Sequence, residues 1–211
     1  INCSLNQNYN KNKYHTKNDF DLKIAKKIKN LDIKYILIST RKIYKIGNNI
    51  KETSKIQPRC NYSKNKLITE KKLLKLLNNK LLILRVSNLI GINQKYTKRK
   101  IHKTFIDHFF LNIKKGIIYD NKNNYKDFLS IKQFSKIIKI LIQKNSIGLF
   151  NVSIGKKVFL NKIIDWLNFY NKKKFIISNL PKNSFDQNFY LNNSKLMQEI
   201  KLKINLTDLE K

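Results

Sequence analysis

Short apolar runs alternate with segments of helical periodicity along this chain. Asp32 to Ser39 and Lys80 to Val86 are apolar runs rich in β-branched and long aliphatic residues, a pattern typical of buried strands in a parallel sheet. Between them, Tyr62 to Leu77 repeats leucines at helical spacing with lysine and glutamate elsewhere. The order strand, helix, strand at this spacing predicts a βαβ unit.

Further elements are predicted on both sides of this unit. Upstream, the pattern predicts a helix over Phe20 to Ile28, which makes Ile1 to Leu5 the tail of a preceding strand. Downstream, we expect helices over Thr104 to Ile113, Ile131 to Ile142 and Asn161 to Tyr170, strands at Gly116 to Tyr119 and Leu149 to Val152, and loops at Asn121 to Asn124 and Asn179 to Asn183. The second half is therefore expected to form a smaller α/β lobe attached to a sheet domain.

Composition excludes several classes of protein. The 211 residues include 41% hydrophobic residues, enough for a sizeable core, so the chain is not a disordered basic tail. No apolar stretch approaches the roughly 20 residues that cross a bilayer, and the opening segment lacks the regions of a signal peptide. Since residue 1 is Ile, we expect the start to be a cut. Cys3 and Cys60 are too few for a disulfide framework or a zinc site, which fits a reducing compartment.

The charge raises the question of nucleic-acid binding. The chain has 45 Lys and Arg against 13 Asp and Glu, a formal net charge of +32. The lysines are spread throughout and accompany many Asn and Ile residues, whereas Ala25 is the single alanine. This composition favours a genome-wide bias towards A/T-rich codons over a selected binding surface, although polyanion binding stays an alternative. Ligands that carry phosphate are compatible with either explanation.

One pair of residues has the spacing of an acid/base site. Tyr62 and Lys66 are four residues apart on the predicted helix, so both project from one face. A neighbouring ammonium lowers the pKa of a phenol, which is otherwise a poor base at neutral pH. Other Tyr/Lys pairs share the spacing, but only this one opens a helix directly after a strand that ends in hydroxyls, Ser39 and Thr40. Ligands bind at this end of the strands in parallel sheets.

A series of motifs then resembles the extended short-chain dehydrogenase/reductases, the NAD(P)-dependent epimerase/dehydratase family that acts on nucleotide sugars. The matching residues of the first half are Ile36 to Thr40 with Ile43-Tyr44, then Glu52, Pro58, Tyr62, Lys66 and Glu70, and then Leu84 to Asn88 with Gly91. Tyr125 to Leu129 is similar to the family's Arg-Asp-Phe/Tyr motif, and Gly148 to Val152 with Gly155 resembles its Gly-x-(Tyr/Phe)-Asn-(Val/Ile) strand. The motifs keep their order across most of the chain.

The resemblance implies a fold and a domain division. It implies a partial Rossmann-like, doubly wound parallel α/β sheet that lacks its N-terminal strands. Residues 1–91 correspond to the C-terminal part of the dinucleotide-binding domain, and 92–211 to a smaller α/β substrate lobe, with 131–152 packing back on the Rossmann sheet. The resemblance also implies NAD or NADP as cofactor, a nucleotide-sugar substrate, no membrane partner and a cytoplasmic location, and it is compatible with a homodimer.

The resemblance further implies catalytic roles. Thr40 falls where the family has the hydroxyl that binds the reacting sugar oxygen, with Ser39 before it. Tyr62 matches the general acid/base. Lys66 matches the lysine that holds the nicotinamide ribose and lowers the pKa of the tyrosine.

The remaining implied roles are in binding. Ser39, Lys66, Val86 and Ser87 are implied as cofactor contacts, and Thr40, Asn88 and Lys126 as substrate contacts. Lys126 stands where the family commonly has a phosphate-binding arginine; a lysine keeps the charge but loses the bidentate fork. His15, His102 and His108 share no metal-ligand spacing, so no metal site is predicted.

Two departures from the family pattern narrow the expected activity. The glycine-rich phosphate loop of the family is absent from this chain, so activity is expected of a longer parent protein. Arg41-Lys42 stand where sugar dehydratases of the family carry Asp-Glu. Two cations cannot replace an acid and a carboxylate base, which disfavours dehydration and decarboxylation and leaves epimerisation or keto-sugar reduction. The alternatives are a degenerate family member kept as a scaffold or regulator, and a basic nucleic-acid-binding module.

Overall fold

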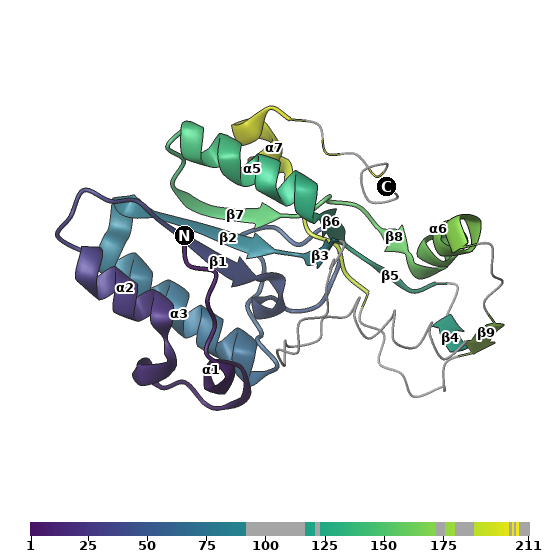
Figure 1. Cartoon of the computed structure of the whole chain (residues 1–211), viewed down its shortest axis with the longest axis horizontal. Helices are drawn as coiled ribbons and strands as arrows, with labels where there is room; N and C mark the ends of the chain where they lie inside the picture. The colour runs from purple at the N-terminus through teal and green to yellow at the C-terminus, as the bar shows by residue number, and fades with distance from the viewer. Residues whose placement is uncertain are drawn as a thin grey trace.

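A three-stranded parallel sheet forms the centre of the larger part of the molecule. The computed structural model describes residues 1–91, 117–120, 123–171, 176–179, 188–202, 204 and 206. Strands β1 (Tyr35–Thr40), β2 (Leu81–Val86) and β7 (Gly148–Val152) pair in the order β1-β2-β7. Both pairings are parallel, with Thr40 opposite Val86 and Val86 opposite Val152. The carboxyl ends of the strands therefore meet at one edge of the sheet (Figure 1).

Helices cover both faces of this sheet, as the short apolar runs predict. Helices α2 (Phe20–Ile28) and α3 (Asn61–Leu77) lie on one face, and α5 (Ile131–Gln143) and α7 (Ser194–Ile200) on the other (Figure 1). Side chains alternate along each strand, so Leu37 and Ile83 pack with α2 and α3, whereas Ile36 and Leu84 pack with α5 and α7. The result is a three-layer α/β/α arrangement.

Shorter elements surround this core. Before β1 lie α1 (Gln7–Lys11) and the 3₁₀ helix η1 (Thr16–Asn18); η2 (Arg41–Ile43) follows β1, and η3 (Asn78–Lys80) follows α3. The second part of the chain contains three two-stranded pairings: β3 (Asn88–Ile90) with β6 (Phe128–Ser130), β5 (Tyr125–Lys126) with β8 (Val158–Phe159), and β4 (Ile117–Asp120) with β9 (Ile176–Asn179). Helix α6 (Leu160–Asn171) follows β8. A separate apolar cluster around Phe128 and Ile163 holds β6, β8 and α6 together.

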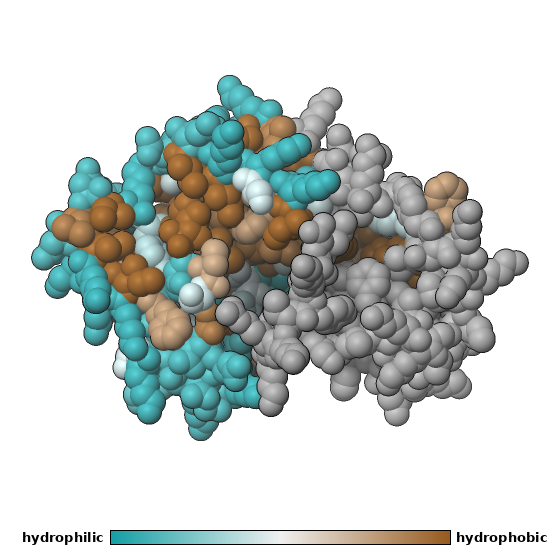
Figure 2. Space-filling model, in the orientation of Figure 1, coloured by the Kyte–Doolittle hydropathy of each residue, from teal (hydrophilic) through white to brown (hydrophobic). Residues whose placement is uncertain are grey.

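Apolar surface appears where the sheet is seen from the side of β1. Figure 2 shows apolar atoms across the middle of this face, where Figure 1 places the sheet, with hydrophilic atoms over the helices on both sides. Among the described strands, β1 is the end strand, so its outer edge has no described strand partner. In the part of the chain that the structure describes, no helix has the length and apolarity to span a membrane.

The predicted fold class is confirmed: the chain has a Rossmann-like parallel α/β sheet with smaller sheets attached. The expectation for Ile1 to Leu5 was wrong, because these residues form no strand. The strand predicted from Asp32 begins at Tyr35, since Asp32 to Lys34 are exposed and pair with no strand. The predicted helix at 104–113 and residues 121–122 and 180–183 of the predicted loops lie outside the described residues.

Candidate active site

The two predicted hydroxyl residues of the site meet at the carboxyl end of β1. Thr40 is the last residue of β1, and its side chain caps η2 by accepting the backbone N–H of Lys42 at 3.3 Å. Helix α3 begins at Asn61, one residue before Tyr62, and its start is held by a hydrogen bond from the Cys60 N–H to Ser63 Oγ at 3.3 Å. The Thr40 side chain lies close enough to the Tyr62 phenol to act on its pKa. A phenol and a hydroxyl thus converge where ligands bind in parallel sheets.

The pKa of Tyr62 differs from the sequence expectation. Burial raises the pKa of Tyr62 to about 12, and the Thr40 side chain opposes this rise. The charges of Cys60 and Asp21 add to the rise, and Lys66, which pairs directly with Asp21, is not among the groups that shift this pKa; a lowering by Lys66 stays a prediction. Tyr62 is therefore protonated at neutral pH, which is the proton-donating form.

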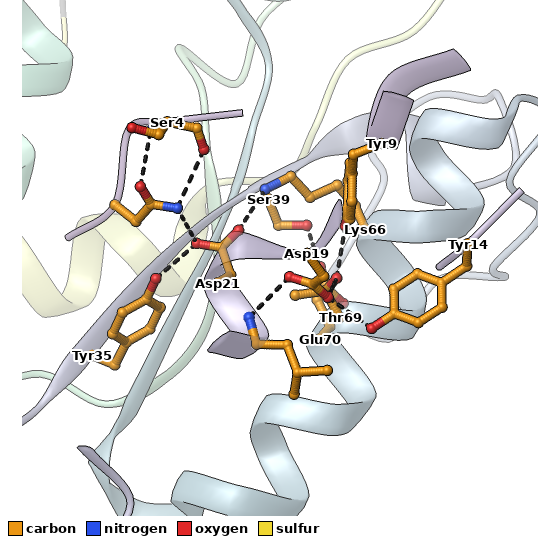
Figure 3. A network of polar contacts seen from close by, with 12 residues as sticks. Ser4, Tyr9, Tyr14, Asp19, Asp21, Tyr35, Ser39, Lys66, Thr69 and Glu70 are labelled. Carbon is orange, nitrogen blue, oxygen red and sulfur yellow. Dashed lines mark hydrogen bonds and ion pairs between the residues drawn. The ribbon is translucent and has the colours of Figure 1, made fainter. Parts of the chain in front are cut away.

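Lys66 lies one turn after Tyr62 and is held by a buried carboxylate. Its Nζ donates to Asp21 Oδ2 at 3.2 Å, and both side chains are buried (Figure 3). The other oxygen of Asp21 accepts from the Tyr35 hydroxyl at 2.7 Å and from Asn2 Nδ2 at 3.0 Å. Burial and these contacts fix the ammonium to α2, since an unpaired charge at such a position is costly.

A second carboxylate ties the same two helices together. Asp19 caps α2 by accepting the Leu22 N–H at 2.9 Å. Its Oδ2 accepts from Tyr14 at 2.8 Å and from Thr69 of α3 at 2.6 Å (Figure 3). The Tyr9 hydroxyl lies 2.7 Å from Thr69 Oγ1. The network therefore sets the position of α2 against α3, and with it the position of Asp21 beside Lys66.

The hydroxyl of Ser39, a predicted cofactor contact, is hydrogen-bonded to another residue of the domain. Its Oγ donates to Glu70 Oε1 at 2.5 Å. Glu70 also forms a two-point ion pair with Arg85 of β2, with Nε at 3.1 Å and one terminal nitrogen at 2.6 Å. Burial lowers the pKa of Arg85, but the contacts and charge of Glu70 outweigh it, so the net shift is upward. This triad connects α3 to both β1 and β2.

The predicted contacts after β2 lie next to the strand that carries Lys126. Val86 is the buried last residue of β2, and the Ser87 N–H donates to Val152 O at 3.0 Å. Ser87 Oγ is buried and has no hydrogen-bond partner among the described residues. The Asn88 amide donates to Asp127 O at 3.1 Å, which places Asn88 beside the residue after Lys126. Lys126 itself is buried in β5.

Asp127 is fully buried. In the sequence it was part of the Tyr125 to Leu129 motif but had no predicted role of its own. Its Oδ2 accepts the Leu191 N–H at 2.9 Å. Burial raises the pKa of Asp127 to about 7, against the lowering effect of hydrogen bonds from Leu191, Ser153, Gly155 and Ile154. A second missed residue is Asp21. The sequence does contain a signal for Asp21, since it is an acidic residue on the apolar face of a predicted helix. In a chain with so few acids, such a position indicates that the carboxylate has a buried partner.

Two other residues considered in the sequence, Trp166 and His15, make contacts that support the fold. Trp166 packs at the edge of the apolar cluster around Phe128, and His15 caps η1 by accepting the Lys17 N–H at 3.2 Å. His102 and His108 lie outside the described residues. Within the described ranges, no group of three or more His, Cys, Asp or Glu could hold a metal ion.

Solved structures of several proteins share the fold of this chain. UDP-N-acetylglucosamine 4-epimerase from Methanobrevibacter ruminantium, in complex with UDP-N-acetylmuramic acid, is similar over 92% of this chain and 66% of its own, with a TM-score of 0.75 and 21% identity. UDP-glucuronic acid 4-epimerase from Bacillus cereus, in complex with NAD, is similar over 88% of this chain and 61% of its own (TM-score 0.72, 18% identity). The chain has the fold of nucleotide-sugar epimerases.

The same fold is present in the Bordetella bronchiseptica enzyme WbmG in complex with NAD, with a TM-score of 0.71 and 21% identity over 88% of this chain and 59% of that one. The chain thus spans between 59% and 66% of the length of these three structures. No protein-family model matches the chain, and no curated protein matches its sequence.

Proposed function

We propose that the protein is an NAD- or NADP-dependent epimerase or keto-sugar reductase that acts on a nucleotide-activated sugar in the cytoplasm. The observation that carries the proposal is the proximity of Thr40 and Tyr62 at the carboxyl end of β1, with Lys66 one turn further along α3. The shared fold of epimerases solved with UDP-sugars or NAD supports it.

The chain's own groups supply proton transfer and orientation. Thr40 holds the reacting sugar oxygen by a hydrogen bond, and Tyr62 exchanges a proton with that oxygen. With its pKa raised to about 12 by burial, Tyr62 holds a proton at neutral pH and donates it to the carbonyl oxygen of a keto-sugar. In the reverse direction Tyr62 has to release its proton to solvent before it can accept the hydroxyl proton of the sugar, and a nearby ammonium such as that of Lys66 favours the phenolate.

The residues at the end of β2 fit a bound dinucleotide. A bound nicotinamide supplies the hydride acceptor or donor that alcohol oxidation and ketone reduction require. Ser87 has a buried hydroxyl oxygen without a partner in the described part of the chain, which is the kind of group that a polar ligand satisfies. Val86 provides an adjacent apolar contact, and Lys66 is the proposed ribose contact. Asn88 and Lys126 are proposed to hold the nucleotide diphosphate of the substrate.

The residues after Thr40 favour epimerisation or reduction over elimination. Arg41 and Lys42 begin η2, directly beside the proposed catalytic pair. Elimination of water from a sugar needs a carboxylic acid and a carboxylate base at this place, and two cations cannot supply them.

The decisive experiment uses the protein expressed from its complete coding sequence. We expect it to bind NAD(H) or NADP(H) and to convert a UDP-sugar. Tyr62→Phe should lower turnover by about 10² to 10⁴-fold, the usual contribution of a general acid/base, with cofactor affinity nearly unchanged. Tyr14→Phe, which removes a hydroxyl that donates to Asp19 and keeps the aromatic ring, is the matched control and should keep turnover. Turnover that survives Tyr62→Phe refutes the proposal, and a protein that binds no dinucleotide favours a scaffold role.

A further inference from the structure

A charged side chain beside the Thr40–Tyr62 pair has no hydrogen-bond partner in the described structure. Arg41 follows Thr40 directly as the first residue of η2. Its Nε is buried and unpaired within the described residues, and none of the ion pairs found there includes it. The residue as a whole is partly exposed, and an unpaired guanidinium at such a position is a group that a ligand or solvent satisfies.

Arg85 shows how an arginine side chain is paired with an acid inside this fold. Arg85 is buried, unlike the partly exposed Arg41, and Glu70 meets its guanidinium at two points. Asp127 is the acid whose charge acts on Arg41, but its carboxylate is not within ion-pair distance and is turned to the Leu191 N–H. Arg85 is therefore paired with an acid, although its Nη1 is buried without a hydrogen-bond partner, whereas no described carboxylate lies within ion-pair distance of Arg41.

The guanidinium of Arg41 is held in a defined orientation. Its central carbon lies 3.5 Å from the centre of the Phe189 ring, and Phe189 is fully buried. Stacking on an aromatic ring fixes the plane of the guanidinium and leaves its edge free for hydrogen bonds. Burial lowers the pKa of Arg41 to about 10, while Asp127 and Cys60 oppose this effect, so the group is charged at neutral pH.

Position also limits what Arg41 can contact. Thr40 lies on one side of it, Cys60 at the start of α3 acts on its charge, and Phe189 packs beneath it. Arg41 thus lies between the start of the helix that carries Tyr62 and the segment that covers Asp127. Because Arg41 directly follows Thr40, its guanidinium is a candidate contact for a substrate whose reacting oxygen is bound by Thr40.

We propose that Arg41 forms an oxyanion subsite of the substrate pocket and binds a carboxylate or phosphate oxygen of the nucleotide sugar. The identity of the ligand rests on the proposed function, whereas the anion site itself rests on Arg41 alone. Two parts of a nucleotide sugar carry such oxygens: an acidic group on the sugar ring, and the diphosphate.

Calorimetric titration of the protein expressed from its complete coding sequence tests this subsite. The probes are UDP, UDP-glucose, UDP-glucuronic acid and inorganic pyrophosphate. Arg41→Gln should weaken only UDP-glucuronic acid, by at least about tenfold, if the sugar carboxylate is the ligand. It should weaken all four probes to that extent if the diphosphate is the ligand. Arg41→Lys keeps the charge without the planar fork and should lose less affinity than Arg41→Gln.

Lys42→Gln is the matched control, because Lys42 is the exposed cation next in sequence and its loss should change no affinity more than about twofold. Wild-type affinity of Arg41→Gln for every probe refutes the subsite, as does an equal loss in Lys42→Gln. If the wild-type protein binds pyrophosphate but no nucleotide sugar, the proposed function fails and the anion site stands. If it binds none of the four probes, both are refuted. Melting temperatures separate loss of binding from loss of folding, and Arg41→Lys serves as the test variant if Arg41→Gln unfolds.

Discussion

Replacing Asp21 with asparagine should destabilise the fold strongly, although the two side chains have nearly the same shape. Asp21 accepts three hydrogen bonds, from Lys66 at 3.2 Å, Tyr35 at 2.7 Å and Asn2 at 3.0 Å, and it is 4% exposed. The substitution leaves the buried ammonium of Lys66 without its counter-charge. Removing one partner of a buried ion pair costs about 3–5 kcal/mol.

Thermal and urea denaturation, followed by far-ultraviolet circular dichroism, measure this loss. Each kcal/mol lowers the melting temperature of a domain of this size by about 2–4 °C, so Asp21→Asn should melt roughly 6–20 °C below the wild type. The control is Asp32→Asn, because Asp32 is fully exposed and lies 3.9 Å from Lys80. That substitution should leave the melting temperature unchanged.

A double substitution tests the reason for the loss. Asp21→Asn combined with Lys66→Met removes both charges, and replacing a buried pair by uncharged groups is often close to neutral. The double variant should therefore be more stable than Asp21→Asn alone. If Asp21→Asn melts with the wild type, or if the double variant is less stable than either single one, the unpaired ammonium is not the cause.

Two further predictions concern stability and need no ligand. Because burial raises the pKa of Asp127 to about 7, against about 3.9 in an unfolded chain, the folded state holds a proton between these pH values that the unfolded state has released. Stability should therefore fall as the pH rises from about 4 to about 7, and Asp127→Asn should flatten this slope in urea denaturation; an unchanged slope contradicts the assignment. Gly155→Ala should cost about 1–3 kcal/mol, because Gly155 has φ of +73° and an added Cβ lies 2.6 Å from Asn193 Cγ. Gly47→Ala, with nothing within 4 Å of the added Cβ, is the control, and equal melting temperatures of the two variants would count against this reasoning.

The regular elements of the core follow from local patterns. The predicted helix at Phe20 to Ile28 has the same bounds as α2, and the helix predicted from Tyr62 begins one residue earlier as α3. Both are amphipathic over several turns, so periodicity alone identifies them. The strands β3, β5, β6 and β8 were not predicted, since two or three residues are too short to show a period.

The wrong prediction of a strand at Ile1 to Leu5 has a different cause. An apolar segment forms a strand only when its backbone groups pair with a neighbouring strand, and these residues take part in none of the described pairings although Cys3 lies near Tyr35 of β1. The sequence showed the apolar residues but not whether their backbone groups would pair.

The sequence by itself determined the alternation of strand and helix, and it placed Thr40 at a strand end and Tyr62 four residues before Lys66 on one helix. These are local properties, because they depend on periods of two and 3.6 residues. Only the tertiary structure decided the charges around them: Asp21 beside Lys66, Glu70 beside Arg85, and Arg41 left unpaired on Phe189. Such contacts join residues far apart in the chain, and the pKa of Tyr62 depends on them together with burial, which no local pattern contains.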